Sequence, residues 1–307
     1  IRDRTTTAHF VKHILTTLGK KCGCVGTAGN DTCSGEIKPS QHGTPTVPRA
    51  TVLYSWLGEM VSNGADYCVM EASSQALDQY RIGDERIVVA GFTNLTRDHL
   101  DYHGTMENYF QAKRRVFTMC KTAVINIDDE YGKRLAQEFS DIAVTYSAEG
   151  IADYHAEFIR MNATGCSYML VNEREKTACR VDMNMTGLYN VQNSLCAIAM
   201  VAALGFDMTE CAKALSDLDG VDGRMNVVYR GDFTVITDYA HTDDALIKVL
   251  STLKPLTKGR LICVFGAAGD RDKEKRPMMA KAAEDNADIL VITSDNPAHE
   301  NPDEIIR

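Results

Sequence analysis

The sequence has no long apolar run, no excess of positive charge and no paired CxxC cysteines, and each absence excludes a class of protein. No apolar stretch approaches the roughly 20 residues of a membrane-spanning helix. The formal net charge of -9 argues against nucleic acid as the main partner. The ten cysteines are scattered, so we expect reduced thiols and no zinc site. Because no secretory leader is recognisable, we expect a cytoplasmic protein.

The chain is long enough for more than one domain, and a large fraction of its residues is apolar. Its 307 residues exceed one ordinary hydrophobic core, so two domains are expected. With 44% hydrophobic and 24% charged residues, it has the composition of a soluble globular protein. A polyanionic substrate would need locally placed cations, because the chain as a whole is acidic.

The most informative stretch is NLTRDHLDYHGTMENYFQAK, residues 94–113. Just after the apolar run 87–92 it crowds together four acid and imidazole side chains, those of Asp98, His99, Asp101 and His103. The run is typical of a fully buried strand, so the cluster falls at a strand's carboxyl end, where open parallel sheets bind ligands. Such crowding is costly unless a divalent cation, or the phosphates that it carries, binds there.

A helix is expected after this cluster, with Thr105 as its N-cap and Glu107 in its first turn. Helical spacing places Lys113 on the same face as Tyr109, Val116 and Phe117. We therefore expect the lysine to point toward the core, although an isolated lysine on a helix is usually solvated.

The whole stretch resembles the Mur ligase family, and most closely its MurE branch, which adds the third amino acid of the peptidoglycan stem peptide. In that family the lysine of a YFxAK pattern is carbamylated and helps to hold magnesium, and the histidine of a DH pair is a second ligand. The resemblance assigns these roles to Lys113 and His99. A carbamate turns a cation into an anion, which suits a metal site.

The segment EASSQALDQYR, residues 71–81, extends the match. It resembles the pattern EVSSHxLxxxR, which implies that Glu71 binds magnesium. The same pattern implies that the UDP-sugar peptide is contacted by Ser73, Gln79 and Arg81, the arginine gripping an anion. In HGTPT, Thr44 matches a threonine-rich segment that contacts the UDP-MurNAc-dipeptide, whereas a plain surface loop explains the rest of that motif equally well.

The amino terminus departs from the family. Residues 5–18 have apolar residues at helical spacing up to Gly19, and the threonines that open this helix resemble the end of a phosphate-binding loop. The family pattern there is GTNGKTT after a strand, but this chain reads IRDRTTT, with Asp3 at a glycine position and Arg4 at the lysine position. Either the sequence lacks residues at this point or nucleotide binding is damaged, and we favour the first. The resemblance implies that Arg4, Thr5 and Thr6 bind ATP and that Thr5 also ligates magnesium.

Further ATP contacts are implied downstream. TGLYNVQNSLCAIAM resembles GxFNVxNxLAAxA, whose asparagines contact adenine, and Asn190 and Asn193 match them. GVDGRMNVV resembles a hinge whose arginine reaches the ATP phosphates, here Arg224. Asp238 of DYAHT resembles the ribose ligand. Between these regions, the irregular alternation over residues 142–185 indicates antiparallel strands.

After residue 221, strands at 233–238, 260–266 and 288–294 each lead into a loop and a helix. Three such units in a row indicate a small parallel α/β domain. Its loops resemble family signatures that contact the phosphate and the incoming amino acid, through Arg271, Asp295 and Asn296. DNPR usually accompanies meso-diaminopimelate, whereas DNPA, with Ala298 here, resembles enzymes that take L-lysine.

The resemblance implies an α/β fold with a central parallel-sheet ATPase domain of the P-loop type over residues 1–221. A smaller Rossmann-like α/β domain, incomplete at its end, covers 222–307. It implies a monomeric ligase using ATP and Mg²⁺, with small-molecule substrates and no nucleic acid or membrane partner. Two alternatives remain: a relative such as folylpolyglutamate synthase or the ligase half of cyanophycin synthetase, and a non-catalytic binding protein, which Asp3 and Arg4 would favour.

Overall fold

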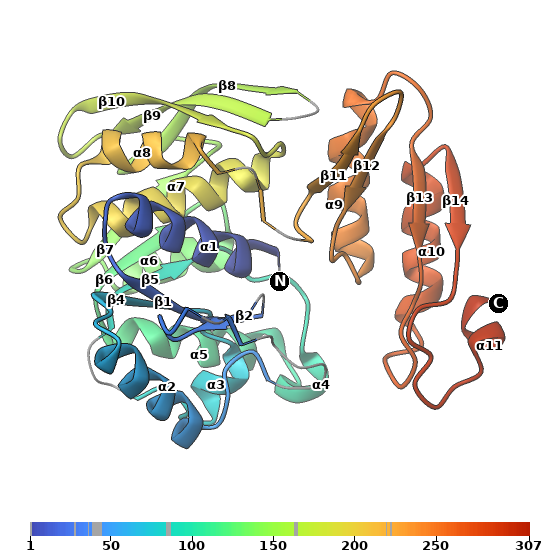
Figure 1. Cartoon of the computed structure of the whole chain (residues 1–307), viewed down its shortest axis with the longest axis horizontal. Helices are drawn as coiled ribbons and strands as arrows, with labels where there is room; N and C mark the ends of the chain where they lie inside the picture. Colours follow the sequence, from blue (N-terminus) through green and yellow to red (C-terminus); the bar gives the residue numbers. More distant parts are fainter. Residues whose placement is uncertain are drawn as a thin grey trace. The chain divides into compact units, whose positions relative to one another are not determined.

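The computed structural model describes residues 2–27, 29–35, 37–38, 45–83, 87–162, 165–218, 220–221 and 223–307. The side chains of Arg2, Ile37, Lys38 and Asp101 lie outside this description, and so does Thr44. The chain forms two compact units (Figure 1). The first consists mainly of Asp3–Arg160 and Gly165–Val221, and the second consists mainly of Asp222–Arg307. In the described part of the chain, no helix is long and apolar enough to span a bilayer.

The larger sheet of the first unit has six strands in the order β10-β9-β8-β7-β6-β5. These strands are β5 (Ile87–Phe92), β6 (Cys120–Asn126), β7 (Ala143–Ser147), β8 (Tyr154–Asn162), β9 (Gly165–Asn172) and β10 (Thr177–Met183). Strands β5 to β8 pair in parallel, whereas β9 and β10 pair antiparallel. The prediction of antiparallel strands over 142–185 is therefore confirmed for β9 and β10 and wrong for β7, which pairs in parallel with both β6 and β8.

Strand β5 begins and ends where the apolar run predicted, but it is not fully buried. It is the last strand of the sheet, and Val88 is 44% exposed. A run of apolar residues cannot distinguish a central strand from an edge strand, because both can present apolar side chains to the helices beside them.

The smaller sheet of the first unit has the order β3-β2-β1-β4. Its strands are β1 (Cys22–Gly26), β2 (Gly29–Asp31), β3 (Ile37–Lys38) and β4 (Tyr67–Met70). β1 pairs in parallel with β4 and antiparallel with β2. Strand β4 therefore delivers Glu71 at its carboxyl end.

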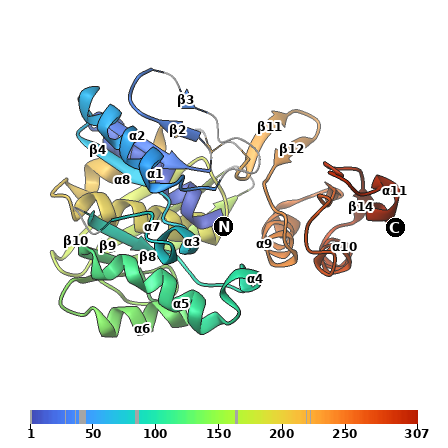
Figure 2. The same ribbon diagram turned by 90° about the horizontal axis from the view of Figure 1, so that it is seen from below.

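Helices pack against these sheets in two cores (Figures 1 and 2). One core includes α1 (Arg2–Thr17), α7 (Leu188–Ala202) and α8 (Met208–Ser216), with Phe10, Tyr168 and Leu195 fully buried. The other includes α2 (Ala50–Ser62), α3 (Ser74–Asp78), α5 (Met106–Arg114), α6 (Glu130–Glu138) and the 3-10 helix η1 (Arg115–Thr118). The short α4 (Leu100–His103) packs on α5. Helix α5 has Thr105 as its N-cap, as predicted.

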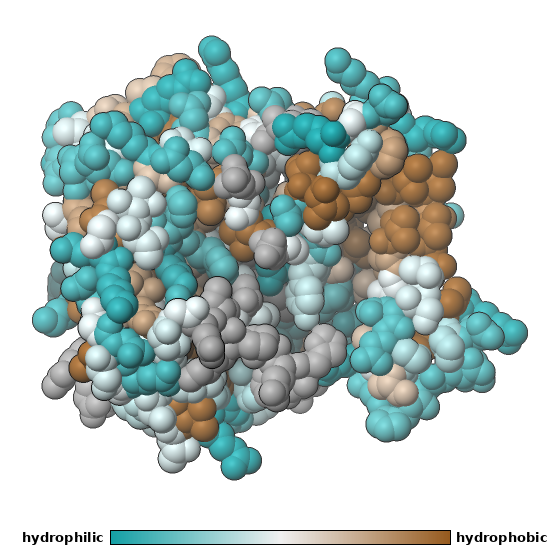
Figure 3. All heavy atoms as spheres, in the orientation of Figure 1, coloured by the Kyte–Doolittle hydropathy of each residue, from teal (hydrophilic) through white to brown (hydrophobic). Residues whose placement is uncertain are grey.

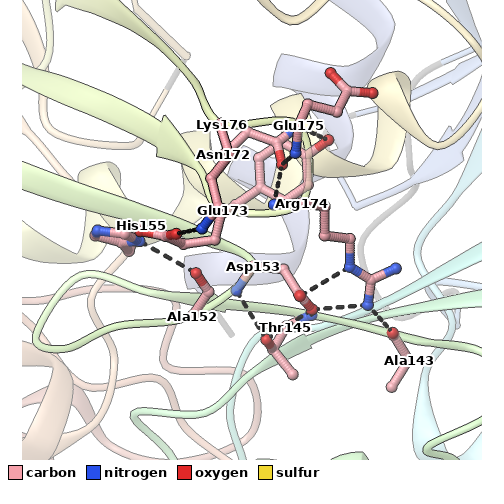
Figure 4. A network of polar contacts seen from close by, with 11 residues as sticks. Ala143, Thr145, Ala152, Asp153, His155, Asn172, Glu173, Arg174, Glu175 and Lys176 are labelled. Carbon is pink, nitrogen blue, oxygen red and sulfur yellow. Dashed lines mark hydrogen bonds and ion pairs between the residues drawn. The ribbon is translucent and has the colours of Figure 1, made fainter.

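A polar network joins the turn after β9 to β7 (Figure 4). Asp153 accepts hydrogen bonds from the backbone N–H and the hydroxyl of Thr145, at 2.7 and 2.9 Å, and forms an ion pair with Arg174. Arg174 also donates to the carbonyl of Ala143 at 2.6 Å. These bonds tie the turn between β9 and β10 to β7 and to the residue that precedes β8.

The second unit contains two short two-stranded sheets. β11 (Asn226–Arg230) pairs antiparallel with β12 (Thr234–Thr237), and β13 (Ile262–Phe265) pairs in parallel with β14 (Ile289–Ile292). α9 (Asp243–Leu253), the 3-10 helix η2 (Lys254–Leu256), α10 (Lys275–Asn286) and α11 (Pro302–Ile306) complete it. All three predicted strands are present, but among the described residues of this unit a parallel pairing is formed only between β13 and β14. Apolar side chains gather over these two strands (Figure 3), where Ile262 and Val264 are 52% and 62% exposed.

Candidate active site

Glu71 is a buried carboxylate at the end of β4, with only 4% of its surface exposed. Its Oε1 accepts a hydrogen bond from the backbone N–H of Thr27 at 2.7 Å, and its Oε2 accepts from the hydroxyls of Thr5 and Thr27 at 3.0 and 3.2 Å. Within the described part of the chain, no basic side chain forms an ion pair with it. A buried carboxylate held only by neutral donors can accept a cation.

Gly26 makes room for this carboxylate, because a Cβ at that position would lie 2.5 Å from Oε1 of Glu71. The hydroxyl that Thr5 donates to Glu71 comes from α1. In this helix Thr5, Thr6 and Thr7 are 1%, 2% and 6% exposed. The helix begins at Arg2, so these threonines lie inside it rather than capping it as they would if they stood alone. Thr5 is therefore placed as a hydroxyl partner of Glu71.

Lys113 points inward from α5, as its position on the helix predicted. Its Nζ donates to the carbonyl of Asn94 at 3.1 Å and lies 5.3 Å from the ring centre of Tyr109 and 5.8 Å from that of Phe92. Burial of the ammonium lowers the pKa of Lys113 to about 7, and the charge of Arg4 contributes to this shift. The carboxylates of Asp3, Asp129 and Asp98 oppose it. A large fraction of the amine is therefore unprotonated near neutral pH.

The first turn of α1 connects Glu71 with Lys113. Asp3 accepts a hydrogen bond from the side-chain amide of Asn94, and the backbone carbonyl of Asn94 accepts one from Lys113. Arg4 donates to the carbonyl of Ala72 at 3.5 Å, one residue after Glu71. Asp3, Arg4 and Thr5 are consecutive, so one helical turn contacts both sides of the candidate site.

His99 lies in the turn before α4, in the left-handed region with φ 53°. Its Nε2 is 3.5 Å from a carboxylate oxygen of Asp98, and its ring meets the ring of Tyr109 edge-on at 6.0 Å. Tyr109 is thus a shared neighbour of His99 and Lys113. The Nε2 of His103 instead hydrogen bonds to Ser74 at 2.9 Å, and the side chain of Asp101 lies outside the described residues.

These residues have the ligand chemistry that magnesium prefers. The Glu71 carboxylate and the Thr5 hydroxyl are hard oxygen ligands in contact with each other. Among the described residues, however, no three His, Cys, Asp or Glu side chains lie close enough to hold a metal ion by themselves. A magnesium site here would need the hydroxyl of Thr5 and the carbamate of a carbamylated Lys113 in addition to Glu71 and His99.

The two asparagines predicted to contact adenine are buried at the start of α7, each 1% exposed. Asn190 donates to the carbonyl of Thr186 at 2.8 Å, and Asn193 donates to Asn190 at 3.4 Å. Asn193 also accepts from the hydroxyl of Thr7 at 3.3 Å, which joins α7 to α1. Each side-chain amide uses only one of its two N–H donors in these bonds, so a base could be contacted without replacing any of them.

The residues predicted to bind the UDP-sugar peptide cluster around α3. Ser73 is the N-cap of α3 and accepts from the N–H of Ala76 at 3.3 Å. Arg81 donates to Gln79 and, at 2.9 Å, to the carbonyl of Val47. Thr44, the remaining member of the set, lies outside the described residues.

In the second unit, Arg224 is 5% exposed and lies 5.1 Å from the ring centre of Tyr239, next to Asp238. Asp238 accepts from the backbone N–H of Met225 at 3.0 Å. Arg224 and Asp238 are therefore close together, as a shared role toward a nucleotide requires.

The loop after β14 carries Asp295, Asn296 and Ala298, and Asn296 accepts from the N–H of Ala298 at 3.0 Å. Gly269, in the loop that also carries the exposed Arg271, donates to the carbonyl of Asn296 at 2.9 Å. Hydrogen bonds from Arg276 and from the backbone N–H of Asp270 lower the pKa of Glu300 to about 2. The two loops that follow β13 and β14 therefore form one charged surface.

Several residues of the candidate site gave no separate signal in the sequence. Asn94 contacts Lys113 and Thr27 contacts Glu71 only because separate segments of the chain converge. Asp129 is the N-cap of α6 and accepts hydrogen bonds from the N–H groups of Tyr131 and Gly132. Its other oxygen also accepts from the N–H of Leu95, beside Asn94.

Comparison with known protein families gives two matches that together cover most of the chain. The Mur ligase middle domain matches residues 4–201. The domain described as Mur ligase, glutamate ligase domain matches residues 223–307.

Curated proteins and solved structures agree with these matches. UDP-N-acetylmuramoyl-L-alanyl-D-glutamate--2,6-diaminopimelate ligase 1 of Clostridium acetobutylicum is 41% identical over 307 residues, 99% of this chain and 62% of that protein. A solved structure of a UDP-N-acetylmuramoyl-L-alanyl-D-glutamate--2,6-diaminopimelate ligase is 36% identical, with a TM-score of 0.74, over 98% of this chain and 62% of the other. The apo form of FPGS from L. casei superimposes with a TM-score of 0.66 over 97% of this chain and 77% of the other, but at 14% identity this indicates a shared fold alone.

Proposed function

The chain belongs to the Mur ligase family, and from that premise we propose that the protein is an ATP-dependent acid–amino-acid ligase of peptidoglycan precursor synthesis. It adds the third amino acid to UDP-MurNAc-L-Ala-D-Glu. The observation that carries the proposal is the 41% identity, across 99% of this chain, to a ligase named for that reaction. The chain spans 62% of the length of that relative. A reaction that uses ATP and UDP-linked precursors belongs in the cytoplasm.

In this proposal residues 1–221 form the ATP-binding domain and residues 222–307 the amino-acid-binding domain. The first turn of α1, with Arg4, Thr5 and Thr6, faces the nucleotide phosphates. Asn190, Asn193, Arg224 and Asp238 complete the nucleotide site. The sugar peptide is bound by Thr44, Ser73, Gln79 and Arg81, and the amino acid by Arg271, Asp295 and Asn296.

The reaction forms one amide bond. The D-Glu carboxylate accepts the γ-phosphoryl group of ATP, and the amine then attacks the acyl phosphate and releases phosphate. Glu71, His99, Thr5 and carboxylated Lys113 would hold magnesium, which when bound neutralises charge on the phosphoryl oxygens. The neutral form of Lys113 supports this assignment, because only an unprotonated amine can add to CO₂, giving a carbamate and releasing one proton. Its pKa of about 7 makes that form available.

For the third amino acid we propose L-lysine. Ala298 stands in the DNPA loop, where a side chain offers no cation to a second carboxylate. Asp295 in the same loop is exposed and carries negative charge, which favours the distal amine of lysine. The relatives compared above are named for 2,6-diaminopimelate. The proposal of L-lysine therefore rests on Ala298 and Asp295 of this chain and not on those relatives.

The test is an assay of ADP and tripeptide formation from UDP-MurNAc-L-Ala-D-Glu, ATP and Mg²⁺, with L-lysine and meso-diaminopimelate offered separately. We expect a ligated product, with L-lysine preferred. Glu71→Gln should lower the rate by about 100-fold or more, because it removes a carboxylate that would hold the magnesium ion. Glu130→Gln is the matched control, because its side chain is 83% exposed and lies outside the site. A folded protein that binds ATP and the sugar peptide but forms no amide would contradict the proposal.

A further inference from the structure

A pocket of about 650 Å³ opens in the first unit between the end of α3, α4, α5 and η1. Helices α3 and α4 both pack against α5 here (Figure 2). Gln111 and Arg115 line the pocket, each two residues from Lys113, which bonds to Asn94. Two residues are about 200° of helical rotation, so the pocket lies on the face of α5 away from the amine. None of the residues proposed above for magnesium, nucleotide or substrate lines it.

Arg115 gives the pocket a cation with open hydrogen-bonding capacity. Its guanidinium carbon lies 3.2 Å from the ring centre of Tyr80, so the planar group is stacked on the aromatic face. Within the described residues, this guanidinium makes neither a hydrogen bond nor an ion pair. Arg114, beside it, instead binds the carboxylate of Glu138. A guanidinium held flat, with its donors unused, is suited to bidentate binding of a phosphate or a carboxylate.

Other walls of the pocket carry hydrogen-bond acceptors on a fixed support. Asp78 accepts from the hydroxyl of Tyr102 at 2.7 Å through Oδ2, and no described donor contacts its Oδ1. Gln111 uses its amide nitrogen on Glu107 at 2.8 Å, which leaves its carbonyl oxygen as an acceptor. His103 braces this side, because its ring stacks on Tyr109 at 5.0 Å. Free acceptors of this kind favour a ligand that brings hydroxyl donors.

We propose that this pocket binds a small hydroxylated anion, with its phosphate or carboxylate on Arg115 and its hydroxyl groups on Asp78 and Gln111. The volume is in the range of small-molecule sites. Tyr80 and Tyr102 add aromatic faces of the kind on which sugar rings pack. The pocket shares no lining residue with the proposed ligase site, but it borders that site, because Gln79 donates to the hydroxyl of Tyr102 at 3.1 Å.

The test is isothermal titration calorimetry of the whole protein with glucose 6-phosphate and with gluconate, which separate the two sources of an oxyanion. Glucose and inorganic phosphate are the component controls. We expect at least one hydroxylated anion to bind more tightly than either component. Arg115→Gln should weaken that binding by about tenfold or more, and Asp78→Asn should weaken it as well. Arg180→Gln should leave it unchanged, because Arg180 is an exposed residue of β10 that pairs with Asp182 and does not line the pocket.

Two further variants separate this site from the proposed magnesium and nucleotide site. Glu71→Gln and Lys113→Met should not alter the affinity for glucose 6-phosphate or gluconate. If either variant weakens binding as much as Arg115→Gln does, the anion is held at the nucleotide site and the proposal is wrong. Absence of binding by both hydroxylated anions to a folded protein would overturn it too, whatever the outcome of the ligase assay.

Discussion

The surroundings of its amine give Lys113 an unusually low pKa. The residue as a whole is only half-buried, yet its ammonium lies 5.3 and 5.8 Å from the ring centres of Tyr109 and Phe92 and donates to a backbone carbonyl. Burial is the largest cause of its low pKa, and three nearby aspartates do not compensate for it. A lysine in such a place costs stability when it is charged. This cost makes functional sense if the amine is used unprotonated.

This cost gives a pH-dependent prediction for Lys113→Met. Between pH 7 and about 10.4 the unfolded chain keeps a proton that the folded protein has lost, so wild-type stability should rise with pH, by at most about 1.4 kcal/mol per unit. Methionine cannot titrate, so the variant should be more stable than wild type at pH 7, with the difference shrinking by pH 8.5. Urea unfolding in CO₂-free buffer measures this, because carbamate formation would remove the titration.

Lys133→Met is the control for that series, since Lys133 is 51% exposed and its partner Glu130 raises its pKa. It should leave the slope between pH 7 and 8.5 unchanged. Equal slopes for wild type and Lys113→Met would mean that the ammonium of Lys113 is not desolvated.

At the scale of the elements, close packing of α6 on β6 depends on one glycine. A Cβ at Gly132 would lie 1.8 Å from the carbonyl oxygen of Asn126. Gly132→Ala must therefore push the helix off the strand, and we expect a loss of about 2–4 kcal/mol in the free energy of unfolding.

Gly58 is the matched control, because it is exposed on α2 and a Cβ added there would meet no atom within 4 Å. Gly58→Ala should therefore gain about 0.5–1 kcal/mol, since alanine loses less conformational freedom than glycine in a helix. Urea denaturation of both variants gives the comparison, and a loss of equal size in both would refute the packing argument.

The elements were predictable where a local pattern decides them. The strand at 87–92 and the helix capped by Thr105 follow from an apolar run and a capping residue. The partners of each strand were not predictable in the same way. Strand β5 lies at the edge of its sheet, and β7 and β8 run parallel to it, because pairing depends on distant segments rather than on the run itself.

In the candidate site, too, residues in local motifs were predictable and contacts between distant segments were not. Glu71, His99 and Lys113 could be named from short motifs because each lies in or just after a recognisable strand or helix. That the first turn of α1 contacts both Glu71 and Asn94 could not be read from any one segment. The motif assigned Arg4 a role toward phosphate but gave no reason for Asp3. In the structure Asp3 binds Asn94 and raises the pKa of Lys113, so it acts on the same amine as burial does, in the opposite direction.

At the scale of the whole molecule, the proposed ligase reaction joins chemistry from the first unit to an amino acid chosen by the second. Ala298 is the position that tests the choice. Its φ is 49°, and because alanine already places a Cβ in this left-handed conformation, arginine adds little backbone strain. Ala298→Arg would add a guanidinium to the loop that we propose binds the distal group of the amino acid. It should repel the amine of L-lysine and attract the second carboxylate of meso-diaminopimelate.

We therefore expect Ala298→Arg to lower kcat/KM for L-lysine and to raise it for meso-diaminopimelate, by about tenfold or more in their ratio. Glu304→Gln is the control, because it changes the net charge by the same single unit from an exposed position on α11. The assay compares both amino acids at limiting concentration with wild type and both variants. An unchanged ratio in Ala298→Arg would show that the distal group is read elsewhere, and an equal shift in Glu304→Gln would reduce the effect to overall charge.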